Sequence, residues 1–253
     1  MSQVEAYTNL AGVYDQIVVD PCHGVIASFL DDLWSTGGDG VREVLDVCCG
    51  TGLLAAELIA RGYRVAGVDA SEAMLARARR RLGPDVRLVR TTLPVLGVDG
   101  AFDAAVCTLD GFNYLAPADL RSTLNDLALR LRSAAWLVFD VDTDAMMAFT
   151  VRTPVVRGEQ GEHRFSITSV VDARARTCDT RIDVTPVASG SPFSENHRQH
   201  FHRPSEIRSA LADAGFEVNA VRDGYTERPA DASTLSATWI ARLTRKPAAT
   251  KCR

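Results

Sequence analysis

Val44–Gly52 constrains the fold more than any other stretch, because an apolar run stops there at a turn of small residues. Beyond the turn, Leu53–Ile59 carries leucine and isoleucine at helical spacing, so the order is strand, glycine turn, helix. Glycine permits a sharp turn and a close ligand, and the free amide groups of the helix start point to the same place. A second apolar run, Arg64–Val68, ends in Asp69, an acidic side chain suited to accept both hydroxyls of a ribose. Together these features predict a nucleoside above the first strand.

Strands and helices alternate at short intervals through the first half of the chain, which predicts a parallel, doubly wound α/β sheet. We expect strands at 44–47, 64–68, 86–89, 102–107 and 135–139, with helices at 52–61, 71–82 and 118–131. After Ala145 the pattern becomes the alternation typical of antiparallel strands. The expected elements there are strands at 164–171, 180–187 and 196–202, a helix at 204–214, and strands at 216–221 and 236–243.

The segment 4–22 precedes the first strand and places Tyr7, Leu10, Tyr14 and Ile17 near one helical face. We therefore expect a helix packed on the core there, and another helix over 25–34.

Charge and composition exclude several classes of function. The net charge of −4 carries no basic field, so we expect no nucleic-acid partner. No apolar stretch approaches the roughly 18 residues of a membrane span, and the polar start Met1–Leu10 is not typical of a signal peptide, so we expect a cytoplasmic protein without a membrane partner. The six cysteines include no C-x-x-C pair, which indicates reduced thiols and no metal site. Arginine greatly outnumbers lysine, a bias that points to a bacterium with a GC-rich genome.

The turn resembles motif I of the class I, Rossmann-like methyltransferases that use S-adenosylmethionine. Their Asp-x-Gly-x-Gly-x-Gly pattern reads here Asp46-x-Cys48-x-Gly50-x-Gly52, and Asp69 follows at the family's distance. Cys48 replaces the first glycine with another small residue. The resemblance extends from about Tyr7 to Leu243 and implies a seven-stranded, mostly parallel sheet with an antiparallel edge hairpin, plus a small antiparallel β cap.

The resemblance also implies how the chain is divided within a single methyltransferase domain. An N-terminal helical lid covers 1–40, the cofactor-binding core 41–145, an inserted substrate cap 146–203, and the last helix and edge hairpin 204–245. Tyr14-Asp15 looks like the Tyr-Asp pair of the family's mobile N-terminal helix.

By the same resemblance the cofactor is S-adenosylmethionine. Asp69 is expected on the ribose, Asp46 near the amino group of the methionine part, and Thr92 and Leu93 at the adenine, where the family has Gly-Asp. The implied cofactor-binding residues are Tyr14, Asp46, Cys48, Gly50, Thr51, Gly52, Asp69, Ala70, Met74, Thr92, Leu93, Thr108 and Leu109.

Methyl transfer from a sulfonium needs mainly alignment, and it needs a general base only when the acceptor is protonated. Histidine is the natural base, and His197, His200 and His202 lie close together before the last helix. Because side chains alternate along a strand, His200 and His202 are expected on one face and His197 on the other. His200 is our first candidate, with His197, Tyr14, Asn113 and Tyr114 as further catalytic candidates.

These observations predict a methyltransferase for a small, largely neutral acceptor of specialised metabolism, on nitrogen, oxygen or an activated aromatic carbon such as an indole. The expected assembly is a monomer or homodimer. Two alternatives stay open: a nicotinamide-dependent oxidoreductase, since Gly50, Gly52 and Asp69 also fit that fingerprint, and a non-catalytic relative that only binds adenosylmethionine.

Overall fold

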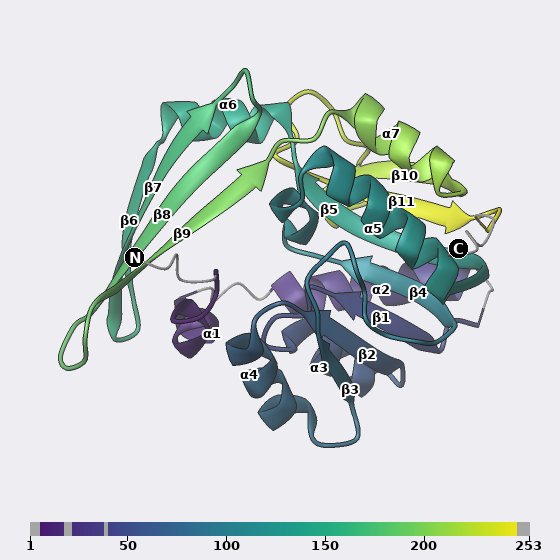
Figure 1. Ribbon diagram of the computed structural model, residues 1–253, viewed down its shortest axis with the longest axis horizontal. Helices are drawn as coiled ribbons and strands as arrows, with labels where there is room; N and C mark the ends of the chain where they lie inside the picture. The colour runs from purple at the N-terminus through teal and green to yellow at the C-terminus, as the bar shows by residue number, and fades with distance from the viewer. Residues whose placement is uncertain (1–5, 18–21, 38–39, 247–253) are drawn as a thin grey trace, which may run out of the picture.

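The computed structural model describes residues 6–17, 22–37 and 40–246 and contains two β-sheets, one of seven strands and one of four. Figure 1 shows the four-stranded sheet projecting from one side of the larger one, with the N-terminal segment below it. The larger sheet and its helices form the core. The smaller sheet is inserted in the sequence between strand β5 (Leu131–Asp142) and helix α7 (Pro204–Asp213) of that core.

The seven-stranded sheet has the order β10-β11-β5-β4-β1-β2-β3. Neighbours β1 to β5 pair in parallel, whereas β11 runs antiparallel to both β5 and β10. The expected mostly parallel sheet with an antiparallel edge hairpin is therefore confirmed. Its strands are β1 Glu43–Val47, β2 Arg64–Asp69, β3 Arg87–Arg90, β4 Phe102–Cys107, β5 Leu131–Asp142, β10 Phe216–Asp223 and β11 Ser236–Leu243.

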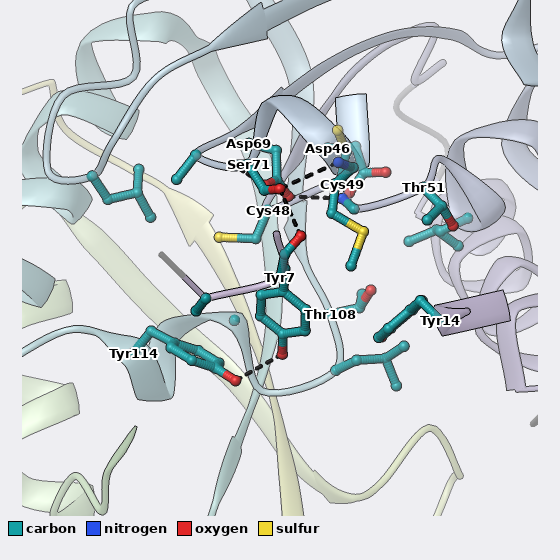
Figure 2. A pocket seen from close by; sticks show the side chains of 18 of the residues that line it. Tyr7, Tyr14, Asp46, Cys48, Cys49, Thr51, Asp69, Ser71, Thr108 and Tyr114 are labelled. Atoms are coloured by element: carbon teal, nitrogen blue, oxygen red, sulfur yellow. Dashed lines mark hydrogen bonds between the residues drawn. The ribbon is translucent and has the colours of Figure 1, made fainter. Parts of the chain in front are cut away.

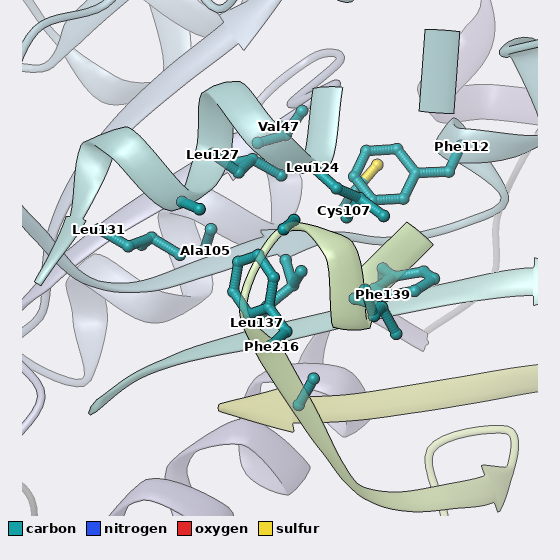
Figure 3. Packing of buried hydrophobic residues seen from close by; sticks show 14 of the residues in the cluster. Val47, Ala105, Cys107, Phe112, Leu124, Leu127, Leu131, Leu137, Phe139 and Phe216 are labelled. Atoms are coloured by element: carbon teal, nitrogen blue, oxygen red, sulfur yellow. The ribbon is translucent and has the colours of Figure 1, made fainter. Parts of the chain in front are cut away.

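Helices cover both faces of this sheet because its central strands are apolar on both sides. The buried side chains of α2 and α3 pack with Val44 on one face, while those of α5 and α7 pack with Leu45 and Val47 on the other. Figure 3 shows residues of the second of these clusters, among them Phe139. The helices are α2 Cys22–Thr36, α3 Leu53–Ala60, α4 Glu72–Leu82, α5 Pro117–Arg130 and α7 Pro204–Asp213.

Local signals set the ends of α4. The Ser71 hydroxyl accepts a hydrogen bond from the amide of Met74 at 3.2 Å, which caps the helix start. Gly83 follows the last turn with φ 82°, a left-handed value that favours glycine, and Arg79–Arg81 lie at the negative end of the helix dipole.

The four-stranded sheet follows α6 Asp144–Arg152 and is antiparallel throughout, in the order β6-β7-β8-β9. Its strands are β6 Val155–Gln160, β7 His163–Asp172, β8 Thr177–Pro186 and β9 Phe193–His200. The sequence did not predict β6, whose run includes Gly158 and charged residues. The predicted strand 196–202 is displaced along the chain: β9 begins at Phe193 and ends at His200, and the ring of His202 lies 3.1 Å from the carbonyl oxygen of Phe112.

The N-terminal segment is not one helix. It contains a short 3-10 turn, η1 Leu10–Gly12, and one helical turn, α1 Tyr14–Ile17, and residues 4, 5 and 18–21 lie outside the described residues. The amides of Tyr7, Asn9 and Leu10 donate to the carboxylate of Glu195, so they are not available for helical hydrogen bonds. Among the described residues no helix is long and apolar enough to cross a membrane.

The core cluster around Phe139 generates a stability prediction. This side chain is fully buried, stacked on Trp239 with ring centroids 6.3 Å apart and 5.1 Å from the ring of Phe112. Phe139→Ala is expected to lower the free energy of unfolding by about 3–5 kcal/mol, because it leaves a cavity. Urea denaturation measures the loss. The exposed control Val170→Ala should cost less than about 1 kcal/mol, and equal losses would contradict this packing.

Candidate functional site

A cavity of about 360 Å³ lies where the carboxyl ends of β1, β2 and β4 meet. Ligands bind at this edge in open α/β sheets, because parallel strands bring their last residues together there. Figure 2 shows the turn after β1 with Asp69 and Ser71 on one side of the cavity and the hydroxyls of Tyr7 and Tyr114 on the other. Many of the site residues predicted from the sequence line this cavity. They are Tyr14, Asp46, Cys48, Gly50, Thr51, Asp69, Ala70, Met74, Thr92, Leu93, Thr108, Leu109 and Tyr114.

The turn after β1 is tied to the end of β2. Cys48 and Gly50 have left-handed φ values of 59° and 54°, and the amide of Gly50 donates to Asp69 Oδ2 at 2.8 Å. The amide of Ser71 donates to Asp69 Oδ1, also at 2.8 Å. Two backbone amides therefore fix the carboxylate, and each oxygen keeps a further lone pair for a ligand.

Gly52 does not line the cavity. It has φ 79°, and a side chain there would come within 2.9 Å of Leu82 and 3.2 Å of Ala78, both on α4. The predicted close approach of Gly52 to a ligand stays a prediction, and the structure adds a second reason for the glycine: the left-handed φ and the close packing of α3 on α4. For Gly50 nothing lies where a side chain would begin, so that position opens on free space.

Asp46 is the most unusual acid of the site. It is only 2% exposed, lines the cavity, and its Oδ2 has no hydrogen-bond partner among the described residues. Burial, and then repulsion from Asp69, raises the pKa of Asp46 to about 8. An unpartnered buried oxygen of this kind is suited to a cationic or hydrogen-bond-donating ligand group.

Tyr14 reaches the cavity because its neighbour is tied to the turn. The Thr51 hydroxyl donates to Asp15 Oδ1 at 2.6 Å, and Asp15 Oδ2 pairs with Arg81 of α4 at 2.5 Å. Burial, reinforced by Asp110, raises the pKa of Tyr14, so its phenol is neutral near pH 7.

The sequence did not predict Tyr7, His23 or Asp119 as site residues, yet all three line the cavity. Tyr7 is held there from two sides, because the Ser71 hydroxyl donates to its carbonyl at 2.9 Å and Glu195 accepts from its amide at 2.7 Å. The phenol oxygens of Tyr7 and Tyr114 lie 2.7 Å apart. The signal available in the sequence was a tyrosine, Tyr7, that precedes the Tyr14-Asp15 pair. Glu195, which holds Tyr7 in place, lies 188 residues further along the chain.

The histidines are arranged differently from the prediction. His200 does not line the cavity; its carbonyl accepts from the Asn113 side chain at 2.8 Å. Asn113 is fully buried, and its oxygen accepts from the amide of Asp142 at 3.1 Å, so both ends of its side chain join backbone segments. The structure therefore gives neither residue contact with a ligand in this cavity. Of the three histidines near the last helix, His197 is the one beside the site, with Nδ1 2.9 Å from the hydroxyl of Tyr114.

Comparison with known proteins agrees with this geometry. Residues 44–134 match the family described as a methyltransferase domain. The provisionally named methyltransferase YqeM of Bacillus subtilis (strain 168) is 26% identical over 227 residues, which are 87% of this chain and 90% of the relative.

Two solved structures share the fold. An S-adenosylmethionine-dependent methyltransferase of Clostridium acetobutylicum ATCC 824 has a TM-score of 0.83 at 21% identity, over 94% of this chain and 99% of the other. CalS10, an amino pentose methyltransferase of Micromonospora echinaspora involved in calicheamicin biosynthesis, has a TM-score of 0.69 at 23% identity, over 96% of this chain and the whole of the other. The matched domain, the full-length relative and the sheet order together support a class I, Rossmann-like methyltransferase that depends on S-adenosylmethionine.

Proposed function

We propose that this enzyme methylates an amino nitrogen of a small molecule in bacterial specialised metabolism. The observation that carries this proposal is the acidic lining of the cavity: among its described lining residues the acidic ones are Asp46, Asp69 and Asp119, and none is a lysine or arginine. Such a lining attracts cations, which suits both a sulfonium and an acceptor that arrives as an ammonium. It revises the expectation of a largely neutral acceptor. CalS10, whose fold is shared, is named for an amino sugar acceptor.

The residues present fit the cofactor. The unpartnered Oδ2 of Asp46 suits its amino group, and Asp69 suits its ribose hydroxyls. On the adenine side we assign Ala70, Met74, Thr92 and Leu93, and beside the methionine part Tyr14, Cys48, Gly50, Thr51, Thr108 and Leu109. When bound, the cofactor supplies a methyl group on a positively charged sulfur.

The acceptor is assigned to the end of the cavity with Tyr7, Tyr114, Leu115 and Asp119. Asp119 is exposed at the start of α5 and is placed to attract an ammonium group. We assign the four-stranded sheet, with residues 146–203, as the substrate cap, and 1–40 as the lid, because Glu195 of β9 holds the segment that carries Tyr7. Alignment in a pocket shielded from water is then the main source of rate.

The oxidoreductase alternative is not favoured by this fold, because β11 runs antiparallel between β5 and β10 whereas dinucleotide-binding sheets are built from parallel βαβ halves. Turnover to adenosylhomocysteine separates the enzyme from a binding-only relative. We place the reaction in the cytoplasm, since Cys48, Cys49, Cys107 and Cys178 form no disulfides.

Asp69→Ala tests the ribose assignment. Loss of charge-assisted hydrogen bonds should cost about 1.5–3 kcal/mol, so affinity for S-adenosylmethionine should fall roughly ten- to a hundredfold in calorimetry. Asp103→Ala is the matched control, because Asp103 also accepts two backbone amides, those of Arg42 and Glu43, but at the other end of the strands. Unchanged affinity in Asp69→Ala would remove the assignment.

The raised pKa of Asp46 leads us to expect that cofactor binding releases a proton. With a pKa of about 8 the free carboxyl holds its proton at pH 7, and a cationic amino group beside it favours the carboxylate. Binding should therefore release close to one proton, and affinity should rise with pH between about 6 and 8. Calorimetry in two buffers of different ionisation enthalpy measures the release. Asp46→Asn should abolish it, and a binding heat independent of buffer in the unaltered protein would contradict the assignment.

The acceptor class is tested with labelled S-adenosylmethionine and four probes: glucosamine, benzylamine, p-cresol and indole. We expect methyl transfer to the two amines, because the acidic lining concentrates cations. Mass spectrometry locates the methyl group. Label found on p-cresol or indole alone would sink the amine proposal in favour of oxygen or carbon.

A further inference from the structure

A line of four polar side chains leads from the cavity to a buried carboxylate. The hydroxyl of Tyr7 lies 2.7 Å from that of Tyr114, which lies 2.9 Å from His197 Nδ1. On the far side of the ring, His197 Nε2 faces Glu195 Oε2 at 3.4 Å, a long contact, and has no other partner among the described residues. Figure 2 shows the first step of this line, at the edge of the cavity.

The carboxylate of Glu195 determines which atom donates in each hydrogen bond of this line. Glu195 has a fully buried side chain, and it accepts the amides of Tyr7, Asn9 and Leu10 at 2.7, 2.5 and 2.9 Å. Burial alone would raise its pKa, but the hydrogen bonds from His197 and these amides hold the pKa of Glu195 below its usual value. An ionised carboxylate only accepts, so the proton of His197 belongs on Nε2, and Nδ1 must accept.

The same reasoning continues to the cavity. Because Nδ1 of His197 accepts, the hydroxyl of Tyr114 donates to it, and the oxygen of Tyr114 is left to accept from Tyr7. The Tyr7 oxygen is then left with free lone pairs and no proton of its own toward the cavity that it lines. Tyr7 also has a left-handed φ of 63°, an uncommon backbone for a bulky residue, which the bonds of Glu195 and Ser71 hold in place.

We propose that Tyr7, Tyr114 and His197 form a proton relay that takes the proton of the acceptor nitrogen, with Glu195 as the residue that sets its direction. This rests on the proposed amine acceptor. The ammonium gives a proton to the Tyr7 oxygen, Tyr7 gives its own to Tyr114, and Tyr114 gives its own to His197 Nδ1. The freed nitrogen lone pair forms the new N–C bond, and the electrons of the breaking C–S bond return to sulfur. His197 ends as an imidazolium beside Glu195 and later releases its proton to water.

The roles within the relay differ. Tyr7 and Tyr114 line the cavity, so Tyr7 is the catalytic residue that meets the acceptor. Neither phenol needs to become a free phenolate: burial raises the pKa of both, so each passes on one proton as it receives another. Glu195 is a positioning residue, because it acts through the ring of His197.

The orientation is tested by nitrogen-15 NMR of protein labelled on histidine, with S-adenosylhomocysteine bound at neutral pH and the His197 signals assigned by their loss in His197→Gln. We expect a neutral ring protonated on Nε2. Glu195→Gln should move the proton to Nδ1, because a glutamine amide can donate to Nε2. A wild-type ring protonated on Nδ1 would turn the phenol protons toward the cavity and overturn the relay.

The chemical role is tested by single-turnover methyl transfer to benzylamine, an ammonium at neutral pH, and to aniline, which is not. Tyr114→Phe should slow transfer to benzylamine by about a hundredfold or more, with little effect on aniline and none on cofactor affinity. Tyr7→Phe should behave alike. The control Tyr63→Phe removes a phenol that donates to Asp31 away from the cavity, at 2.5 Å, and should change neither rate.

The contrary outcomes are distinct. Equal losses with benzylamine and aniline would show that Tyr114 only packs. A selective loss with benzylamine in His23→Gln, but not in Tyr114→Phe, would show that the proton leaves through His23 instead. If the unaltered enzyme methylates neither amine, the proposed acceptor fails, while the position of the proton on His197 still decides whether the relay is oriented as described.

Discussion

The parallel register of β1 with β2 and β4 is the constraint on which the site depends. Val47 lies opposite Val68, and Asp46 opposite both Gly67 and Val106, so the turn after β1 begins level with the ends of both neighbours. The backbone ladder therefore delivers the turn, the acid at the end of β2 and the loop after β4 to one edge. Two amides donated to Asp69 then fix the turn itself, which makes the cavity a consequence of the sheet.

A second carboxylate, Glu195, joins the parts that lie above this edge. It extends from β9 of the small sheet and accepts three amides of the N-terminal segment, so the inserted sheet is tied to the segment whose Tyr7 and Tyr14 line the cavity. Burying a carboxylate is costly unless it is fully hydrogen bonded, and here the bonds also set the orientation of His197. This interaction therefore holds the N-terminal segment, the proposed lid, and orients the ring at the end of the proposed proton path.

Much of the fold, and the part of the candidate site formed by the turn after β1 and the end of β2, could be predicted because the sequence signals are local. The apolar run, the small-residue turn and the acid at the next strand end follow from a few adjacent residues. Tyr7 could not be found this way, since Glu195, which holds it, lies far along the chain. Neither could the choice of His197 over His200, which depends on which face of β9 is buried. Gly52 shows a further limit of prediction from sequence. A glycine required for helix packing and a glycine required for the approach of a ligand look the same in the sequence.

A crystal structure of the complex with S-adenosylhomocysteine tests the assigned position of the cofactor. We expect both ribose hydroxyls within hydrogen-bonding distance of Asp69, the amino group beside Asp46, and the sulfur directed toward the end of the cavity with the hydroxyls of Tyr7 and Tyr114. A nucleoside bound away from Asp69, or a sulfur directed away from the two phenols, would contradict it.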